Sequence, residues 1–377
     1  MIMFYKKISY NKIFLYLFYP ILYIIQFLIS IILNIRHWLY DKEIFKSYQF
    51  SNVFTICIGN LNLGGVGKSP HTNYLIQLLK PHYKLAVLSR GYGRKTKGFL
   101  VVESHHHFSQ TGDEPLMYKL KHPDVVVAVC EDRVKGIQEI LKLFPDTQIV
   151  LLDDAFQHRR LKAHLNILIT EFHHPFYEDQ LFPLGTLRDI KFSCKKSQMI
   201  VFSKTPENAE LSEIQIRENN IRKLCPNNPI YFSEIEYLEL YHFHQPSQKI
   251  NIFHQLYQYN CILVTGIAHP EPLAAIIKEY AQHFYHLKYP DHHHFSIKDL
   301  DLIKDLWKEW QKKHSPSIII TTEKDAVRLK SFALEHFNIP IFVAPIEISF
   351  KKFSNTFDNK ILYYVRTNST NYSVHSK

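Results

Sequence analysis

The sequence contains little cysteine and little glycine, and these scarcities exclude several classes of protein. There are 5 cysteines and 11 glycines among 377 residues. The cysteines are odd in number, lie far apart and form no CxxC pair, so neither a disulfide framework nor a zinc ribbon is indicated. Hydrophobic residues make up 46% and charged residues 21% of the chain. This is ordinary globular usage, which excludes a disordered chain, a collagen and a coiled coil.

Acidic residues are outnumbered by basic ones. The chain has 45 lysines and arginines against 35 aspartates and glutamates, which gives a formal charge of +10. This balance favours phosphate-bearing partners such as a nucleotide, a nucleic acid or an anionic lipid. The basic residues are spread along the chain and no RNA- or DNA-binding motif is present, so we predict no nucleic-acid partner.

One long segment carries no charge. Residues 13–35 read IFLYLFYPILYIIQFLISIILNI, and about 20 apolar residues suffice for a helix that crosses a bilayer. The run is too long for a cleaved signal peptide, and no small-residue cleavage site follows it. A spanning helix, a helix in the membrane interface and a buried core helix are the three interpretations. Because a core helix so long and so uniformly apolar is unusual, we predict that residues 1–40 form a membrane-associated helix.

A glycine-rich loop follows the first apolar strand. Residues 53–58 (VFTICI) predict a buried strand, and residues 71–80 predict an amphipathic helix. In such a loop, glycines let backbone N–H groups surround phosphates at a helix N-terminus, a lysine reaches the terminal phosphates and a hydroxyl holds Mg²⁺. Asn62 stands where the usual pattern has glycine, but GGVGKS in this context predicts nucleotide binding. The predicted nucleotide-binding residues are Gly64, Gly65, Val66, Gly67, Lys68 and Ser69.

A pair of carboxylates ends a second buried strand. Residues 148–152 (QIVLL) predict this strand, and Asp153 and Asp154 follow it. In phosphate-loop enzymes such a carboxylate holds Mg²⁺ directly or through water. Adjacent residues of a strand point to opposite faces, so we expect one of the two, and not both, to contact the metal.

Further apolar strands alternate with helical patterns along the chain. This alternation predicts an α/β fold with parallel sheets covered on both faces, and a ligand site at the carboxyl ends of the strands. A polar stretch with two prolines over residues 205–228 suggests a boundary. We therefore expect a membrane helix at 1–40, a P-loop NTPase-like nucleotide-binding domain at 41–205, and a smaller α/β domain at 206–377 that completes the active-site cleft.

Four further polar segments stand near strand ends, and each has a plain structural interpretation beside a functional one. Residues 89–94 (SRGYGR) include Arg90 and suit phosphate or acidic head groups, or form a solvated turn. Residues 113–114 (Asp-Glu) suit a helix cap, a base or a magnesium ligand. Residues 292–294 are three histidines; adjacent residues rarely converge on one ion, so a single proton-accepting histidine is the better interpretation. Residues 321–325 (TTEKD) suit a phosphate contact or a salt-bridged turn.

Together these motifs resemble one family, the tetraacyldisaccharide 4'-kinases (lipid A 4'-kinases) of Gram-negative bacteria. The resemblance runs from Ile58 to Leu329, and nine ordered motifs are far more specific than any one of them. Two departures are Ala155, where glycine is expected after the paired aspartates, and a variant form of a Pro-Gly-Leu-Arg segment. The matching segments are IGNLNLGGVGKSP, SRGYGR, TGDEP, LLDDAFQH, FPLGTLRD, FSKT, VTGIAHP, YPDHHHF and TTEKDAVRL.

The resemblance implies transfer of the ATP γ-phosphoryl group to the 4'-hydroxyl of a tetraacylated glucosamine disaccharide 1-phosphate, which gives lipid IVA. It implies Mg²⁺, a membrane-held lipid partner without an obligate protein partner, and an active site on the cytoplasmic face of the inner membrane. It also implies a catalytic pair, Asp113 and His292, with His293 as the alternative to His292. Because the two residues lie on different halves of the chain, we hypothesise that the cleft between the halves closes on the reactants. The other implied site residues are Ser69, Glu114, Asp153 and Asp154 near Mg²⁺, and Arg133 and Arg188 at phosphates or head groups.

A different function also accounts for part of the sequence. A membrane-tethered P-loop ATPase or GTPase switch that acts on a protein partner explains the phosphate loop and the apolar helix. It leaves the segments around Asp113 and His292 unexplained.

Overall fold

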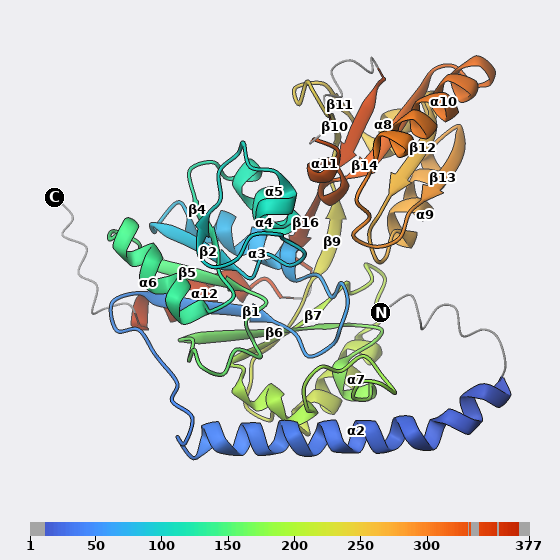
Figure 1. Ribbon diagram of the computed structural model, residues 1–377. Helices are drawn as coiled ribbons and strands as arrows, with labels where there is room; N and C mark the ends of the chain where they lie inside the picture. The colour runs from blue at the N-terminus through green and yellow to red at the C-terminus, as the bar shows by residue number, and fades with distance from the viewer. Residues whose placement is uncertain (1–11, 331, 333–338, 353, 369–377) are drawn as a thin grey trace.

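The computed structural model describes residues 12–330, 332, 339–352 and 354–368. The chain builds two α/β units joined by a two-stranded ladder (Figure 1). We call the unit with the eight-stranded sheet the first unit, and the unit with the six-stranded sheet the second unit. This arrangement confirms the predicted α/β class with parallel sheets.

The first unit is built on a mostly parallel sheet in the order β3-β4-β2-β5-β1-β6-β7-β8. β3 runs antiparallel to β4, and the other pairs are parallel. The strands are β1 (Phe54–Gly59), β2 (Leu85–Ser89), β3 (Leu100–Val101), β4 (Val126–Val129), β5 (Ile149–Asp153), β6 (Leu165–Glu171), β7 (Met199–Ser203) and β8 (Ile230–Phe232).

Helices cover both faces of this sheet because its central strands are apolar on both sides. In β1, Ile56 and Ile58 belong to the core under α3 and α5, whereas Cys57 belongs to the opposite core under α6. Successive side chains of a strand alternate between faces, so an all-apolar strand requires cover on each. The helical segments are α3 (Lys68–Leu79), α4 (Phe108–Thr111), α5 (Asp113–Lys121), α6 (Arg133–Leu143), η1 (Phe176–Glu178), η2 (Lys191–Lys196) and α7 (Leu211–Arg222).

The second unit repeats this layering on a smaller sheet, in the order β11-β10-β15-β14-β12-β13. Its central pairs are parallel, and β10 runs antiparallel to β11 and β15. The strands are β10 (Leu240–His242), β11 (Lys249–Ile250), β12 (Asn260–Thr265), β13 (His283–Lys288), β14 (Ser317–Thr322) and β15 (Ile341–Ala344). The helical segments are α8 (Ile252–Gln255), η3 (Leu256–Gln258), α9 (Glu271–Tyr280), α10 (Ile297–Lys313) and α11 (Glu323–Leu329).

The boundary expected at residue 206 differs from the packing. Residues 205–228 are no linker, because they include α7, whose Ile221 is buried in the first unit, and β8 follows in the first sheet. The chain crosses to the second unit through β9 (Glu234–Tyr237) and returns through its antiparallel partner β16 (Ile346–Ser349). α12 (Phe357–Asn368) then packs Ile361 and Val365 into the core of the first unit. The second unit is thus an insertion between two parts of the first.

The apolar segment near the amino terminus forms one helix, α2 (Lys12–Asp41), which lies beneath the first unit in Figure 1. Residues 18–41 of α2 are long and apolar enough to cross a membrane. Most apolar side chains of this segment are exposed, for example Ile32 at 64% and Phe27 at 59%. A less exposed stripe recurs every three or four residues, as one face of a helix does. The stripe is Leu22, Gln26, Ile29, Leu33 and His37.

Candidate active site

The phosphate loop connects β1 to α3 and is shaped by two glycines with left-handed backbone. Gly64 and Gly67 have φ angles of +116° and +91°, which residues with a Cβ rarely adopt. Gly67 directly precedes α3, so the loop ends at the positive pole of a helix, where backbone N–H groups attract anions. Ser203, the last residue of β7, donates to the Val66 carbonyl at 2.7 Å. The backbone of the two glycines and the bond from Ser203 therefore fix the shape of the loop.

His71, in the first turn of α3, provides a second hold on the loop. Burial lowers the pKa of His71 to about 4, so its ring is neutral near pH 7. Because a carbonyl can only accept, Nδ1–H donates to the Gly67 carbonyl at 2.6 Å, and Nε2 accepts from the Ser233 hydroxyl at 2.9 Å. The loop is thus tied to the residue that follows β8.

Lys68 lies in a polar cluster at the carboxyl ends of β1 and β5. Its Nζ is 3.0 Å from Asn60 Oδ1 and 3.8 Å from Asp154 Oδ2. Arg188 donates to the same two side chains, at 2.5 Å to Asn60 Oδ1 and 3.0 Å to Asp154 Oδ2. Burial lowers the pKa of Lys68, and Asp154 opposes this effect. The cluster places two cationic side chains beside the phosphate loop.

The two adjacent aspartates occupy different surroundings because Asp154 has a left-handed backbone, with φ +52°. Asp153 is fully buried, and burial followed by the charge of Glu114 raises its pKa to about 7. Burial would also raise the pKa of Asp154, but Lys68 and Arg188 outweigh it and lower that pKa. Asp154 is therefore an ionised partner of the cations, whereas Asp153 accepts a hydrogen bond of 3.1 Å from the Tyr118 hydroxyl.

Glu114, at the start of α5, connects the phosphate loop to the second unit. Its Oε1 accepts from Ser69 Oγ at 2.5 Å and from Lys324 Nζ at 2.5 Å. Burial would raise the pKa of Glu114, but the charge of Lys324, from α11, lowers it overall. This partly buried ion pair joins the two units next to the loop.

Oxygen donors suited to Mg²⁺ meet at this point. Ser69, Glu114 and Asp153 come from α3, α5 and β5. Among the described residues, no group of three or more His, Cys, Asp or Glu side chains is arranged to hold a metal ion by itself. Mg²⁺ in phosphate-transfer sites usually takes one or two carboxylates and completes its shell with phosphates and water, so this donor set fits the ion. Burial, followed by the charges of Glu114 and Asp154, raises the pKa of Asp153, and a bound cation would oppose both effects.

Asp113 and His292 meet across the two units. Asp113 is the first residue of α5, and His292 follows β13 in a left-handed conformation, with φ +56°. His292 Nδ1 lies 3.2 Å from Asp113 Oδ2. The hydrogen bond to Asp113 raises the pKa of His292, against the effect of burial. Burial would raise the pKa of Asp113, but His292 and Arg328 hold it well below its usual range.

Arg328 is a buried residue of α11 that binds this pair. Its Nε and Nη2 donate to Asp113 Oδ2, the former at 3.1 Å, and Nη2 lies 3.3 Å from His292 Nδ1. Its Nη1 donates to the Gly266 carbonyl and to Asp325 Oδ1, both at 2.9 Å. Arg328 is 2% exposed. The guanidinium therefore fixes the Asp113 carboxylate against the second unit.

The two neighbouring histidines have other partners. His293 Nε2 lies 3.1 Å from Asp299 Oδ2, and its ring stacks on Tyr289 with centroids 4.5 Å apart. The ring of His294 packs on Phe108, with centroids 5.1 Å apart. The geometry therefore favours His292 over His293 as the partner of Asp113.

The three arginines implied at phosphates occupy different settings. Arg188 belongs to the cluster around Lys68. Arg133 is buried, and its guanidinium donates to the backbone carbonyls of residues 130, 131 and 154, so it braces the ends of β4 and β5. Arg90, after β2, is exposed. The structure brings Arg188 to the loop, whereas Arg133 is turned to the backbone.

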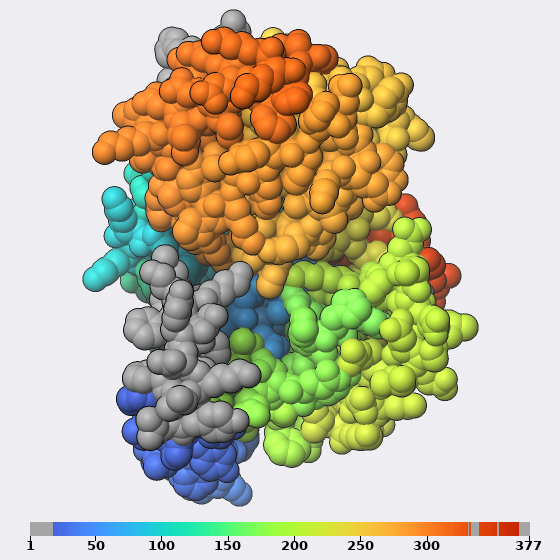
Figure 2. Space-filling view, turned by 90° about the vertical axis from the view of Figure 1, so that its right-hand side faces the viewer, coloured from blue at the N-terminus to red at the C-terminus, as the bar shows by residue number. Residues whose placement is uncertain are grey.

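A cleft runs beside the phosphate loop between the two units. Its volume is about 460 Å³, and it is lined by residues 62–66 of the loop, by residues of the segment 171–179, and by His269 of the second unit. Figure 2 shows a hollow between the orange second unit and the green part of the first, with blue residues of the amino-terminal half inside it. The hollow leads from solvent toward the loop.

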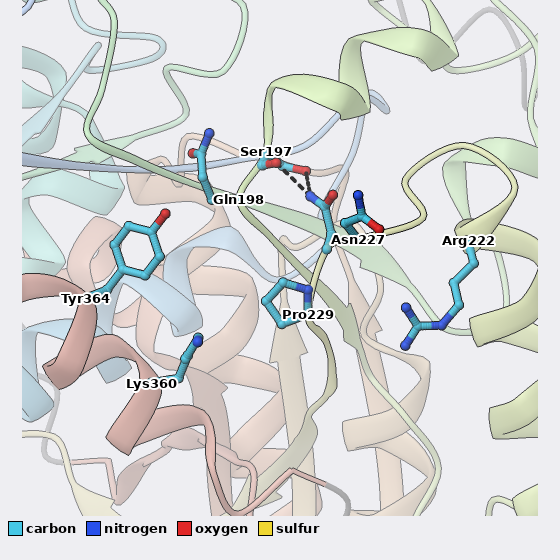
Figure 3. A pocket seen from close by; sticks show the side chains of 8 residues that line it. Ser197, Gln198, Arg222, Asn227, Pro229, Lys360 and Tyr364 are labelled. Atoms are coloured by element: carbon cyan, nitrogen blue, oxygen red, sulfur yellow. Dashed lines mark hydrogen bonds between the residues drawn. The ribbon is translucent and has the colours of Figure 1, made fainter.

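A second cavity, of about 620 Å³, lies at the amino ends of β7 and β8, whereas the phosphate loop lies at the carboxyl end of β1. It is lined by Ser197 and Gln198 before β7, by Arg222 of α7, and by Lys360 and Tyr364 of α12 (Figure 3). Several of its polar groups already have partners in the protein; for example, the Ser197 carbonyl accepts a bond of 2.6 Å from the side chain of residue 228. We assign this cavity no part in the chemistry at the loop.

Sequence reasoning missed Asn60, Arg328 and the contact of Lys324 with Glu114. Asn60 and Arg328 lie inside segments that carried the resemblance, but nothing in their residue types marked them as part of the site. Lys324 was noted as a phosphate contact or a turn residue, and its partner comes from the other unit. The strand end could have marked Asn60 and Lys324, which lie just beyond the carboxyl ends of β1 and β14. Arg328 lies in the last turn of α11 and carried no such signal.

Comparisons with known proteins agree on one family. The family model described as Tetraacyldisaccharide-1-P 4'-kinase matches residues 18–363. The tetraacyldisaccharide 4'-kinase of Phocaeicola vulgatus is 36% identical over 89% of this chain and 92% of its own length. That of Bacteroides thetaiotaomicron is 36% identical over 93% of this chain and 94% of its own. A crystal structure of LpxK from Aquifex aeolicus in complex with ATP aligns with a TM-score of 0.70 and 26% identity, covering 93% of this chain and 98% of that one.

Proposed function

The chain belongs to the tetraacyldisaccharide 4'-kinase family, and we propose that it performs the family reaction between its phosphate loop and the Asp113–His292 pair. It is an ATP-dependent kinase that phosphorylates the 4'-hydroxyl of a tetraacylated disaccharide 1-phosphate, a precursor of lipid A. One hydrogen-bonded chain supports the residue assignment. Ser69 binds Glu114, and the adjacent Asp113 binds His292. The proton acceptor thus lies next to the phosphate loop, although it comes from the other unit.

His292 accepts the proton of the 4'-hydroxyl through Nε2. Nδ1 carries the proton and donates to the Asp113 carboxylate at 3.2 Å, so its contact of 3.3 Å with Arg328 Nη2 is not a hydrogen bond. The Nε2 lone pair is then free to act as the base. The side chain is 39% exposed, so a substrate hydroxyl can reach it. The hydroxyl oxygen forms a bond to the γ-phosphorus, the bond from that phosphorus to the β,γ-bridging oxygen breaks, and ADP leaves.

Lys68 and Arg188 offset the negative charge of the transferring phosphoryl group. Phosphoryl transfer depends on positioning and charge neutralisation more than on covalent chemistry. Mg²⁺, held by Ser69, Glu114 and Asp153, would supply further positive charge at the β- and γ-phosphates. Lys324 brings α11 against Glu114, and this closure of the second unit excludes water from the reactants.

The cleft beside the loop receives the nucleoside part of ATP. It adjoins residues 62–66, and it carries His269 together with the carboxylates of Glu171, Glu178 and Asp179. Glu171 and Glu178 pair with Lys204 and Arg217, but a carboxylate has about four lone-pair sites and can accept further hydrogen bonds from ribose hydroxyls and amino groups. Arg90, exposed after β2, remains a proposed contact for the phosphate of the acceptor.

The acceptor lipid stays in the membrane, and α2 holds the enzyme there. One stripe of α2 faces the body of the protein and the other sides are apolar and exposed, so α2 suits a helix that lies in the interface better than one surrounded by lipid. Extracting the acceptor would cost about 0.8 kcal/mol for each CH₂ group exposed to water. We place the active site at the cytoplasmic face of the inner membrane, where ATP is available.

Incubation with radiolabelled ATP and the disaccharide 1-phosphate lipid tests this function. A doubly phosphorylated lipid is expected from the wild type. His292→Gln is expected to transfer the label about 10²–10⁴-fold more slowly, because it lacks the general base. Hydrolysis of ATP at the same rate with and without the lipid would instead favour the P-loop switch.

A further inference from the structure

The carboxyl-terminal end of α2 contacts the protein differently from the rest of the helix. The outer face of α2 is apolar, but its last turns carry Arg36 and His37, which make polar contacts with the first unit. Arg36 Nη2 donates to the Gln157 carbonyl at 2.7 Å. His37 is 7% exposed, and its Nε2 lies 2.6 Å from Asp189 Oδ1. A helix that served only to hold the protein at the membrane would not need these hydrogen bonds to the first unit.

The first contact leads to the cluster that holds Lys68. Gln157, whose carbonyl binds Arg36, donates its own Nε2 to the Asn60 carbonyl at 2.7 Å. The side chain of Asn60 accepts from Lys68 and from Arg188. Two hydrogen bonds therefore separate α2 from the residue that positions the phosphate-loop lysine.

The second contact leads to the same cluster from the other side. Arg159 donates to His37 Nδ1 at 2.8 Å, and because a guanidinium can only donate, Nδ1 accepts and Nε2–H donates to Asp189. Asp189 is fully buried and directly follows Arg188, whose guanidinium binds Asn60 and Asp154. Moving His37 would move the backbone that carries Arg188.

We propose that Arg36 and His37 are positioning residues of the nucleotide site, so that the helix that meets the membrane also holds Asn60, Arg188 and, through them, Lys68. This inference rests on the proposed nucleotide site around Lys68. It makes α2 more than an anchor, because loss of its last turns impairs nucleotide binding even where no bilayer is present.

The test is binding of a non-hydrolysable ATP analogue with Mg²⁺ to the full-length chain in zwitterionic detergent micelles, without acceptor lipid. Arg36→Ala weakens the affinity by about tenfold, the size expected for the loss of one hydrogen bond from a charged donor. Arg36→Lys keeps a cationic donor and restores part of the affinity. In turnover assays, KM for ATP rises more than kcat falls, and the KM for the lipid in micelles is unchanged.

Two further variants make the test independent of a general loss of structure. Arg222→Ala removes the same kind of bond, from a guanidinium to the Pro226 carbonyl, far from the loop, and leaves the affinity unchanged. Gln157→Ala removes the hydrogen bond to Asn60 without altering α2. The double variant Arg36→Ala/Gln157→Ala binds the nucleotide little more weakly than either single variant, because both substitutions interrupt the same chain of hydrogen bonds.

Equal affinity of Arg36→Ala, Gln157→Ala and the wild type, within about twofold, overturns the inference. The inference is also overturned if the affinity losses of Arg36→Ala and Gln157→Ala add fully in the double variant and each variant lowers the unfolding temperature as much as Arg222→Ala does. Failure of the wild type itself to bind the analogue is a separate result, which would refute the nucleotide site and not merely the part played by α2.

Discussion

Replacing Asp113 with Asn tests the proposed division of labour in the catalytic pair through the pH dependence of turnover. The neutral form of His292 is the base, so turnover falls as pH drops through the pKa of His292. The hydrogen bond to Asp113 raises that pKa above its ordinary value of 6.5. In Asp113→Asn the negative partner is lost, while burial, which lowers the pKa, remains. The acid limb of kcat therefore moves to lower pH in the variant.

The size of the effect on kcat follows from what a base contributes. General-base catalysis is worth about 10²–10⁴-fold, so His292→Gln loses a factor in this range. Asp113→Asn keeps the imidazole of His292 but removes the carboxylate that orients it. Its kcat therefore falls by no more than that of His292→Gln. The pair also contributes to folding stability. Because the folded pKa of His292 is raised, this contribution is complete below the unfolded pKa and disappears as pH rises through the folded pKa.

The assay is transfer of radiolabelled phosphate to the micellar lipid, measured across the pH range in which imidazole titrates. His293→Gln is the matched control, because His293 pairs with Asp299 and not with Asp113. The acid limb of kcat in this variant is expected to coincide with that of the wild type. An unchanged acid limb in Asp113→Asn, or an unchanged kcat in His292→Gln, would remove His292 from the mechanism.

Three further substitutions probe other parts of the structure. Arg328→Gln leaves the buried Asp113 without its cationic partner, so it lowers the free energy of unfolding by about 3–5 kcal/mol; a urea midpoint equal to that of the wild type would contradict this. Lys68→Ala lowers kcat by at least about 10²-fold, the scale of losing one charge-stabilising group, with an unchanged circular dichroism spectrum; retained turnover would exclude the lysine. Ile32→Ser, on the outer face of α2, weakens binding to lipid vesicles by about tenfold, the scale of one apolar side chain, in a flotation assay; undiminished flotation would show that this face does not meet the bilayer.

Local features of the chain were predictable because they depend on neighbouring residues. The phosphate loop is a strand, a glycine-rich turn and a helix within about thirty consecutive residues, and the backbone freedom of its glycines accounts for its shape. The apolar helix α2 and the parallel sheets follow equally from local runs of apolar residues. These patterns need no knowledge of what packs against them.

The domain boundary was less predictable. A polar, proline-bearing stretch resembles a linker, yet Ile221 and Cys225 within it are buried in the core of the first unit. Likewise, nothing local in α12 shows that Ile361 and Val365 return to the first unit. Burial of a few apolar side chains decided the packing in both cases, and sequence pattern does not say which core receives them.

The pairing of distant side chains depends on how the two units pack. Arg328 reaches Asp113 across 215 positions of the chain, and His292 reaches it across 179. Asn60 reaches Lys68 within its own loop, but it accepts from Arg188 only because the loop after β1 and the segment that contains Leu187 lie side by side. Residue type and spacing record which groups are available for chemistry, whereas the distances and angles between them arise from the packing of sheets, helices and units, which brings remote residues within hydrogen-bonding range.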